Sequence, residues 1–405
     1  MKILFLTLAD FNSISERNIY TDLLREFVKH GHEVRIISPT ERRNGQHTHV
    51  IREKNSIILK LRTGNMQKTG MIEKGISMLK IEPLFVYAIR KYFAGEKFSL
   101  VLYCTPPITF CKAVNYVKKR DHAKTYLMLK DIFPQGAVDL GVLKKNGLKG
   151  ILYRYFRTKE KKLYRISDKI GCMSVANVAY VLNHNPEISS EKVEVCPNCI
   201  EAVDLSLSDV ERMTVRKKYG IPEDRTVFVY GGNLGKPQGI GFMLKCLHSQ
   251  RKNRAVFFLI VGSGTEYPRI EKYIEKYQPE NIKLMSWIPK EDYDKVIAAC
   301  DIGMIFLDYR FTIPNFPSRL LNYMAAKLPV LACTDVNTDI GKMIVDNGFG
   351  WWCESTILDS YSRVVQEIIE SEYRQMGINA FEYLVENYFT EMVYKIITGS
   401  LFGIR

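Results

Sequence analysis

Short apolar runs alternate with helical segments along the whole chain, and this alternation limits the possible folds more than any other feature. Near the start, an apolar run at 2–9 (KILFLTLA) is followed by a polar loop and by a segment at 19–29 with apolar residues at helical spacing. A second apolar run, HEVRIISP, follows at 32–39. A strand, a helix and a strand in this order form the unit from which parallel sheets are built. The sequence therefore predicts an α/β fold.

The alternation occurs in two series, which indicates two domains. Further strands are expected at 99–104, 124–130, 169–174, 226–232, 255–264, 281–288, 302–308, 329–334 and 348–353. Between the series, the segment 192–209 is expected to be a strand followed by irregular polar chain, and 405 residues are too many for one ordinary core. We expect two Rossmann-like, doubly wound domains at 1–200 and 201–378. A C-terminal helix at 379–405 is expected to pack back on the first domain.

The lengths of the apolar runs and the spacing of the cysteines disfavour some classes of protein. No apolar run reaches the roughly 18 residues that a membrane-spanning helix needs. The apolar N-terminus is short and is closed by Asp10, which favours a buried first strand over a signal peptide and predicts a cytoplasmic protein. Of the nine cysteines, only Cys196 and Cys199 form a CxxC pair. Without a second pair nearby, we expect reduced structural thiols rather than a zinc or redox site.

Charge is distributed unevenly between the two halves. Residues 1–200 contain 34 Lys and Arg against 18 Asp and Glu, a net charge of +16, whereas residues 201–405 contain 24 against 26, a net charge of −2. This asymmetry predicts an anionic partner for the first half. A nucleic acid is disfavoured, because no helix-turn-helix, zinc-finger or RNA-binding signature accompanies the charge. An anionic membrane surface is the better interpretation.

Two glycine-containing loops follow strands of the second half, where open parallel sheets bind ligands. GGNLGKPQG at 231–239 combines glycines, Lys236 and a following helix, features that suit an anion. VGSGTE at 261–266 places Gly262 and Gly264 at the next strand end. From the residues alone, each loop is equally compatible with a plain turn.

Two further strand ends carry charged residues. Pro317 and Ser318 suit the start of a helix, which places Arg319 in its first turn. A cation opposes the helix dipole there, so a bound anion such as a diphosphate is favoured over a surface arginine. Asp131 directly follows the expected strand at 124–130. It could act as a base or orient a substrate hydroxyl, but by itself a helix cap is favoured.

Together, these motifs resemble glycosyltransferase family 4, a retaining family with the GT-B fold. The stretch ending in GHEV at 31–34, the linker-like CPN at 196–198, the phosphate loop at 230–239 and the signature-like helix NYMAAKLPV at 322–330 occur in the family's order. The resemblance covers essentially the whole chain. KDIFPQGAVDLGVL at 130–143 and PSRLL at 317–321 resemble a branch related to fucosamine transferases of surface-polysaccharide biosynthesis.

The resemblance implies two Rossmann-like domains that face a central cleft, the first binding an acceptor and the second a nucleotide sugar. It implies a hexosyl- or N-acetylhexosaminyl-transferase. The donor is expected to be UDP-linked. The acceptor is expected to be a saccharide linked to a polyprenyl diphosphate, in the biosynthesis of capsule, O-antigen or another surface polysaccharide. UDP-sugar epimerases share this architecture and are one alternative. A non-catalytic nucleotide-binding relative is another.

The family pattern also assigns site residues. Expected donor-binding residues are Gly232, Asn233, Gly235, Lys236, Gln238, Gly262, Gly264, Ile288, Ser318, Arg319, Leu320 and Asn322. The nucleotide base is expected near Trp287 and Ile288, mostly against backbone. Asp131 stands in the loop where many relatives carry a catalytic histidine and is the expected catalytic residue. Asn12 and Arg17, in the polar loop after the first strand, are expected on the acceptor side.

Departures from the family pattern concern the donor site. Two glutamates that many members carry correspond here to Pro314 and Asn322, and Asn322 could bind the ribose without charge. The usual arginine and lysine of the phosphate loop correspond to Asn233 and Gln238, for which Lys236 and Arg319 could compensate. No Asp-x-Asp motif occurs in the expected loops, so we expect metal-independent transfer without a cofactor. The nucleotide sugar is a substrate.

The run at 71–93 bears on where the protein works. It mixes apolar residues with Lys74, Lys80, Arg90 and Lys91, and Pro83 interrupts its helical spacing. By itself, the run is best interpreted as a core helix with a solvated face. Together with the net charge of +16 on residues 1–200, it predicts peripheral association with the anionic inner face of the cytoplasmic membrane.

Overall fold

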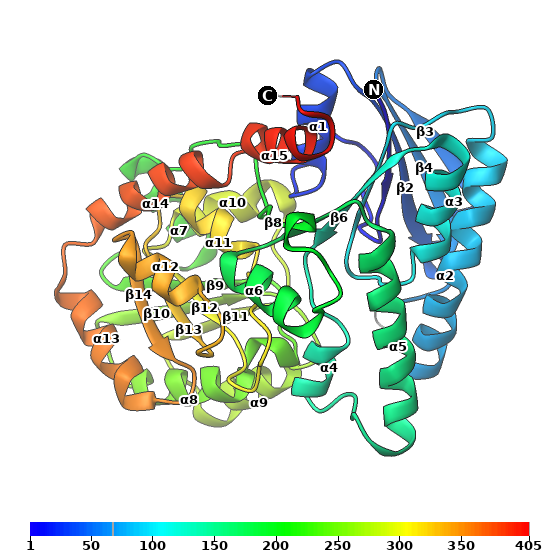
Figure 1. Ribbon diagram of the computed structural model, residues 1–405. Coiled ribbons are helices and arrows are strands. Elements are labelled where there is room, and N and C mark those ends of the chain that lie inside the picture. The colour runs from blue at the N-terminus through cyan, green and yellow to red at the C-terminus, as the bar shows by residue number, and fades with distance from the viewer. Residues whose placement is uncertain (67–68, 405) are drawn as a thin grey trace. The chain divides into compact units, whose positions relative to one another are not determined.

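The computed structural model describes residues 1–66 and 69–404, and the chain forms two compact units, each built around a sheet (Figure 1). The first unit is Met1–Glu201 with Thr390–Arg405, and the second is Ala202–Phe389. The chain returns to the first unit at Thr390, inside the segment 379–405. The reason is that α14 (Arg374–Asn387) packs on α11 (Arg319–Ala325) of the second unit.

The sheet of the first unit has eight strands in the order β3-β4-β2-β1-β5-β6-β7-β8. The strands are β1 (Lys2–Leu6), β2 (Glu33–Glu41), β3 (His49–Arg52), β4 (Ser56–Thr63), β5 (Leu100–Cys104), β6 (Lys124–Leu129), β7 (Lys169–Cys172) and β8 (Val193–Val195). All neighbours are parallel except β3 and β4. Without the two edge strands the order is that of a Rossmann fold, and it reverses between β1 and β5.

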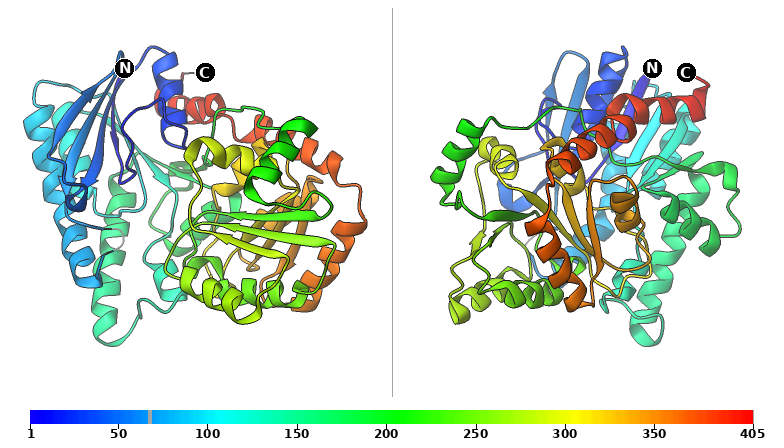
Figure 2. Two further views of the ribbon diagram at one scale, coloured as in Figure 1. Left: turned by 180° about the vertical axis from the view of Figure 1, so that it is seen from behind. Right: turned by 90° about the vertical axis from the view of Figure 1, so that its left-hand side faces the viewer.

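Helices cover both faces of this sheet (Figure 2). The helices of this unit are α1 (Thr21–Lys29), α2 (Met71–Tyr92), α3 (Cys111–Asp121), α4 (Gln135–Asp139), α5 (Gly147–Ile166), α6 (Val175–His184) and α15 (Thr390–Phe402), with short 3-10 turns at Arg42–Asn44 and Ser190–Lys192. On one face α15 packs on α1, and on the other α3 packs on α2 and α5. The predicted interruption at Pro83 does not occur, because Pro83 lies on the exposed side of α2, where water can bond the carbonyl that loses its N–H partner.

The second unit has a fully parallel sheet in the order β11-β10-β9-β12-β13-β14. Its strands are β9 (Thr226–Gly231), β10 (Val256–Val261), β11 (Ile282–Met285), β12 (Ile302–Phe306), β13 (Val330–Thr334) and β14 (Gly350–Glu354). The remaining elements are α7 (Asp209–Tyr219), a 3-10 turn at Lys236–Gln238, α8 (Ile240–Gln250), α9 (Tyr267–Tyr277), α10 (Lys290–Ala298), α12 (Ile340–Asp346) and α13 (Leu358–Glu370). The strand order is again that of a Rossmann fold, and it reverses between β9 and β12.

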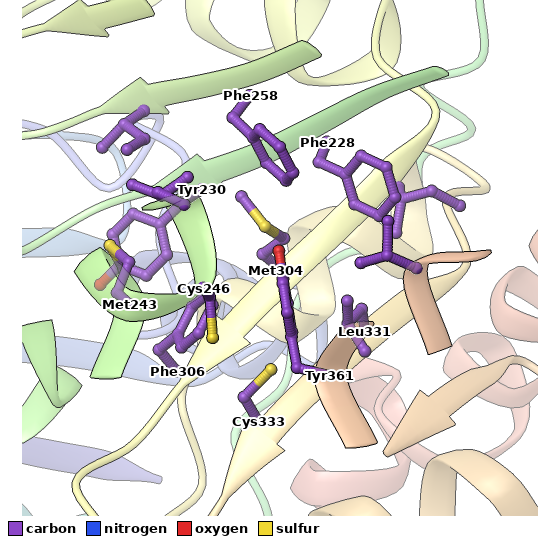
Figure 3. Close-up of a cluster of buried hydrophobic side chains, with 14 of the residues drawn as sticks. Phe228, Tyr230, Met243, Cys246, Phe258, Met304, Phe306, Leu331, Cys333 and Tyr361 are labelled. Carbon is purple, nitrogen blue, oxygen red and sulfur yellow. The ribbon is translucent and has the colours of Figure 1, made fainter. Parts of the chain in front are cut away.

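The core of the second unit is rich in aromatic and sulfur-containing side chains (Figure 3). Phe228 and Phe258, on adjacent strands, pack with tilted rings whose centroids are 5.2 Å apart. The thiols of Cys333 and Cys353 lie 3.4 Å apart across β13 and β14. All nine cysteines of the chain are buried and free. In the part of the chain that the structure describes, no group of His, Cys, Asp and Glu side chains could hold a metal ion.

Candidate functional site

The loop after β9 lies beside the point where the strand order of the second unit reverses. Gly232, the first residue after the strand, has φ +124°, a backbone conformation that residues with a side chain rarely adopt. A Cβ at Gly232 would lie 3.6 Å from the guanidinium carbon of Arg319. The glycine therefore brings bare backbone against the arginine, as an anion site at a strand end requires.

Polar side chains of the same loop form hydrogen bonds that stabilise its turn. Gln238 Oε1 accepts hydrogen bonds from the N–H of Gly235 at 3.0 Å and from Asn233 Nδ2 at 3.1 Å. The N–H of Asp308, after β12, donates to the carbonyl of Pro237 at 2.9 Å. The two loops beside the strand-order reversal are therefore joined through backbone. In this structure Asn233 and Gln238, expected to bind the donor, hydrogen-bond within the loop.

Gly262 and Gly264 have a packing role that the sequence did not reveal. The N–H groups of Gly232 and Leu234 donate to the carbonyls of Val261 and Ser263, both at 2.9 Å, so the loops after β9 and β10 run against each other. A Cβ on Gly262 would lie 1.8 Å from the Gly232 oxygen, and one on Gly264 would lie 2.3 Å from the Leu234 oxygen. Both glycines are needed for this close backbone approach.

Gly262→Ala is expected to lower the stability of the protein by about 1–3 kcal/mol, because the methyl group must displace backbone. Thermal unfolding without ligand measures the change. Gly241→Ala is the matched control, since Gly241 lies inside α8 and its Cβ would meet only Arg269 Nη2, at 3.7 Å. Alanine is favoured over glycine in a helix by about 0.5–1 kcal/mol, so the control should be slightly stabilised. Equal melting temperatures for the two variants would contradict the packing role.

Arg319, the first residue of α11, is the central cation of this site. Its guanidinium lies 4.4 Å from the ring centroid of Tyr230, the residue before the loop's first glycine. Within the described residues, Nη1 of Arg319 is buried and has no hydrogen-bond partner. A buried guanidinium nitrogen without an acceptor costs free energy unless a ligand supplies one.

Two more tyrosines complete the surroundings of Arg319. The Tyr323 hydroxyl accepts the N–H of Gly231 at 3.0 Å and donates to the carbonyl of Met304 at 3.2 Å. The Tyr293 hydroxyl covers the end of β9, only 2.2 Å from where a Cβ of Gly231 would stand. Burial raises the pKa of Tyr293 to about 12, so its hydroxyl stays protonated and can donate. Tyr293 comes from a different segment of the chain, and no local motif singles it out.

The other predicted donor-binding residues differ in their exposure to solvent. Lys236 and Ser318 are exposed, and Asn322 is half-buried three residues after Arg319, on the same side of α11. In the described ranges, the amide of Asn322 makes no hydrogen bond and remains available. Leu320 and Ile288, in contrast, are buried, so their side chains contribute to the core. Trp287, beside Ile288, is 71% exposed and offers a surface against which a base could lie.

Asp131 lies at the carboxyl edge of the other sheet, directly after β6 and Lys130. Thr105, at the end of β5, fixes this point: its hydroxyl accepts the N–H groups of Lys130 at 3.1 Å and Asp131 at 3.3 Å. Although the residue is partly exposed, the protein around the Asp131 carboxyl removes water from it, and this desolvation raises its pKa to about 6. The carboxyl is therefore largely ionised at neutral pH and close to its titration range.

The loop after β1 contains Asn12 and Arg17, both exposed. A fully buried lysine, Lys60 on β4, holds this loop by donating to the Asp10 carboxylate, to the Phe11 carbonyl at 3.0 Å and to Ser38 Oγ at 3.3 Å. Lys60 was not among the predicted site residues, although a lysine inside the apolar run SIILKLRT signals a buried partner.

Comparisons with known proteins agree with this architecture. Residues 211–383 match the family described as glycosyl transferases group 1. The chain is 24% identical over 328 residues to a probable glycosyltransferase, WbjE, of Pseudomonas aeruginosa, covering 79% of this chain and 78% of the relative. It is 23% identical over 248 residues to a putative colanic acid biosynthesis glycosyl transferase, WcaI, of Escherichia coli K12, covering 58% of each.

Solved structures show the same fold over the full length. Sucrose-phosphate synthase from Thermosynechococcus elongatus superposes with a TM-score of 0.77 at 16% identity, over 99% of this chain and 98% of that one. Anabaena Alr3699/HepE in complex with UDP-glucose gives 0.69 at 14% identity, over 100% of both chains. The predicted class, two parallel α/β domains of GT-B type, is confirmed. The chain has the GT-B fold, and residues 211–383, within its second unit, match the group 1 glycosyl transferase family.

Proposed function

We propose that this protein transfers a sugar from a UDP-linked donor to a lipid-linked saccharide acceptor in surface-polysaccharide biosynthesis. The observation that carries the proposal is the buried, unpartnered Nη1 of Arg319 beside the glycine loop after β9. An anion the size of a diphosphate would satisfy it. The complexes of Alr3699/HepE with UDP and UDP-glucose, and the colanic acid role in the name of WcaI, support the choice of donor and pathway class.

The donor site suits a leaving diphosphate. Arg319 and the exposed Lys236 offer two cations to the negative charge that develops as the glycosidic bond breaks, and the Tyr293 hydroxyl offers a further hydrogen bond. The amide of Asn322 would bind a ribose hydroxyl. These groups neutralise the leaving group without a metal, and transfer with retention of configuration follows the family pattern.

Asp131 would interact with the acceptor hydroxyl. Its carboxylate, with a pKa of about 6, can accept a proton at neutral pH. Asn12 and Arg17 are proposed to contact the acceptor from the loop that Lys60 and Asp10 hold.

A panel of UDP-, GDP- and dTDP-sugars, scored by thermal shift and then by product analysis, tests the function. A UDP-sugar should raise the melting temperature most, since a ligand that binds only the folded state stabilises it by mass action. Product analysis with no acceptor present separates transfer from epimerisation. Binding without turnover on any lipid acceptor would reject transferase activity.

We also propose that the first unit attaches to an anionic membrane through α2, α3 and α5. Large apolar side chains on this surface are exposed: Ile76 by 50%, Leu79 by 55% and Tyr87 by 55% on α2, with Ile151 and Leu152 on α5. Exposed basic residues accompany them, namely Lys74, Lys80, Arg90, Lys91, Lys112 and Lys119. Apolar residues among cations are typical of surfaces that lie in the headgroup region of a bilayer. Among the described residues, no helix is long and apolar enough to span one.

Sedimentation with liposomes across a salt series tests this attachment. Binding should require anionic lipid, because each basic residue near an anionic surface contributes about 1 kcal/mol. Binding should weaken towards molar salt, where the screening length is about 3 Å. Leu79→Ser with Tyr87→Ser should weaken binding at all salt concentrations, whereas Tyr277→Ser, at an exposed tyrosine of the second unit, should not. Equal recovery with neutral vesicles would reject the proposal.

A further inference from the structure

Lys130 is an uncompensated cation at the carboxyl edge of the first unit's sheet. It follows β6, and its side chain is half-buried. Two other lysines of the first unit, one buried and one half-buried, are paired: Lys60 with Asp10, and Lys118 with Asp168 at 2.6 Å. Over residues 1–66 and 69–404, the ammonium of Lys130 has neither a hydrogen bond nor an ion pair. Charged groups removed from water normally have a partner, so its absence points to a ligand.

Three thiols, rather than a carboxylate, influence the ammonium of Lys130: those of Cys196, Cys199 and Cys104. Burial raises the pKa of Cys196 to about 11 and also raises the pKa of Cys199 and Cys104, so all three are protonated at neutral pH. Burial in turn lowers the pKa of Lys130, the direction expected for an ammonium without a counter-ion.

Asn198 supplies an independent sign of a missing ligand. It lies between Cys196 and Cys199 in the chain and is only 4% exposed. Its Oδ1 is buried and has no partner within the described residues. Lys130 follows β6 and Asn198 follows β8, so both lie at the carboxyl edge of the same sheet. This edge therefore has a cation without an anion and a hydrogen-bond acceptor without a donor. A phosphate and a hydroxyl of one molecule would satisfy both.

Thr105 fixes the backbone of Lys130 beside that of Asp131, the proposed base. Its hydroxyl accepts the N–H groups of Lys130 and Asp131 and donates to the Asp131 carbonyl at 3.1 Å. The ammonium and the carboxylate thus belong to adjacent residues whose backbone is fixed from β5. A single ligand bound by Lys130 would therefore also be able to contact Asp131.

We propose that Lys130 and Asn198 bind the phosphate-bearing part of the acceptor, Lys130 through a phosphate oxygen and Asn198 through a hydroxyl. This deepens the proposed function, on which it rests, by assigning recognition of a phosphate-linked acceptor to named residues of the first unit. A neutral acceptor would lack the partner of Lys130.

The test compares two acceptors in the full-length protein: a saccharide linked through a diphosphate to a short prenyl chain, and the same saccharide on an uncharged alkyl chain. Lys130→Met should raise KM for the diphosphate acceptor at least about tenfold, leave KM for the neutral one within about twofold, and leave UDP-sugar affinity unchanged. Lys130→Arg should restore most of the loss. Lys124→Met, at the exposed amino end of the same strand, is the control and should change neither KM. An equal change for both acceptors, or none, would overturn the proposal.

A binding measurement keeps the test independent of transferase activity. In a Lys236→Ala/Arg319→Ala background, which removes the two cations of the second unit's site, inorganic pyrophosphate should still bind by calorimetry, and adding Lys130→Met should abolish that binding. Lys130→Gln replaces Lys130→Met if the methionine variant does not fold. Pyrophosphate binding that is insensitive to Lys130 would reject the site. Pyrophosphate binding that depends on Lys130, with KM for the diphosphate acceptor unchanged, would assign the site to free phosphate and reject the acceptor role. Absence of transfer with any acceptor would reject the proposed function alone.

Discussion

The double variant Lys236→Ala/Arg319→Ala is expected to lose the rise in melting temperature that a UDP-sugar gives the wild-type protein. Hydrogen bonds to charged groups contribute about 1.5–3 kcal/mol each, so removal of both cations should weaken binding by a factor of about 100 or more. At a ligand concentration of 100 times Kd, the wild-type protein gains about 2.7 kcal/mol, a shift of several degrees. Differential scanning fluorimetry measures it.

The matched control is Lys245→Ala/Arg251→Ala, which removes the same charges further along α8 and just beyond its end. It should retain the full ligand-induced shift. Both double variants must melt close to the wild-type protein without ligand. UDP-sugar affinity that is unchanged in Lys236→Ala/Arg319→Ala would show that the phosphates bind elsewhere.

Asp131→Asn is expected to lower the transfer rate at least about a hundredfold, or about 2.7 kcal/mol of activation free energy, while UDP-sugar binding is retained. The amide keeps the size of the side chain but removes its charge and basicity. Radiolabelled-donor transfer assays give kcat and KM, and thermal shift gives donor binding. Asp139→Asn, at the end of α4, is the control for a nearby carboxylate and should keep most of the activity. Activity of Asp131→Asn within a few-fold of wild type would make Asp131 a structural residue.

The pH dependence supplies a second measure of Asp131. Its pKa is raised to about 6, and only the ionised carboxylate can accept a proton. The transfer rate should therefore be close to its maximum above pH 7 and should fall about tenfold for each pH unit below pH 6. In Asp131→Asn, this inflection should vanish from the residual activity. An inflection that persists in the variant would belong to another group.

The boundaries of the elements show what local pattern can and cannot reveal. The strands at 99–104 and 302–308 were predicted within two residues of β5 and β12, because continuous apolar runs bounded by polar residues specify buried parallel strands. β4 was not predicted, since Lys60 and Arg62 break its apolar run. Lys60 is buried there only because Asp10, Phe11 and Ser38, distant in sequence, surround its ammonium.

The sequence by itself determined the fold class and the loops that could bind ligands, because the periodicity of apolar residues and the placement of glycines are local properties. Tertiary structure decided which of these loops meet. Arg319 lies against Tyr230 only because β12 pairs with β9 and brings α11 to the same strand end. Likewise, Gly262 packs on Gly232 through the pairing of β10 with β9. Whether a charge is paired depends on such long-range neighbours. The apolar run around Lys60 indicates a buried partner, but no local pattern could show which residues supply it, or that Lys130 and Arg319 Nη1 have no partner within the described chain.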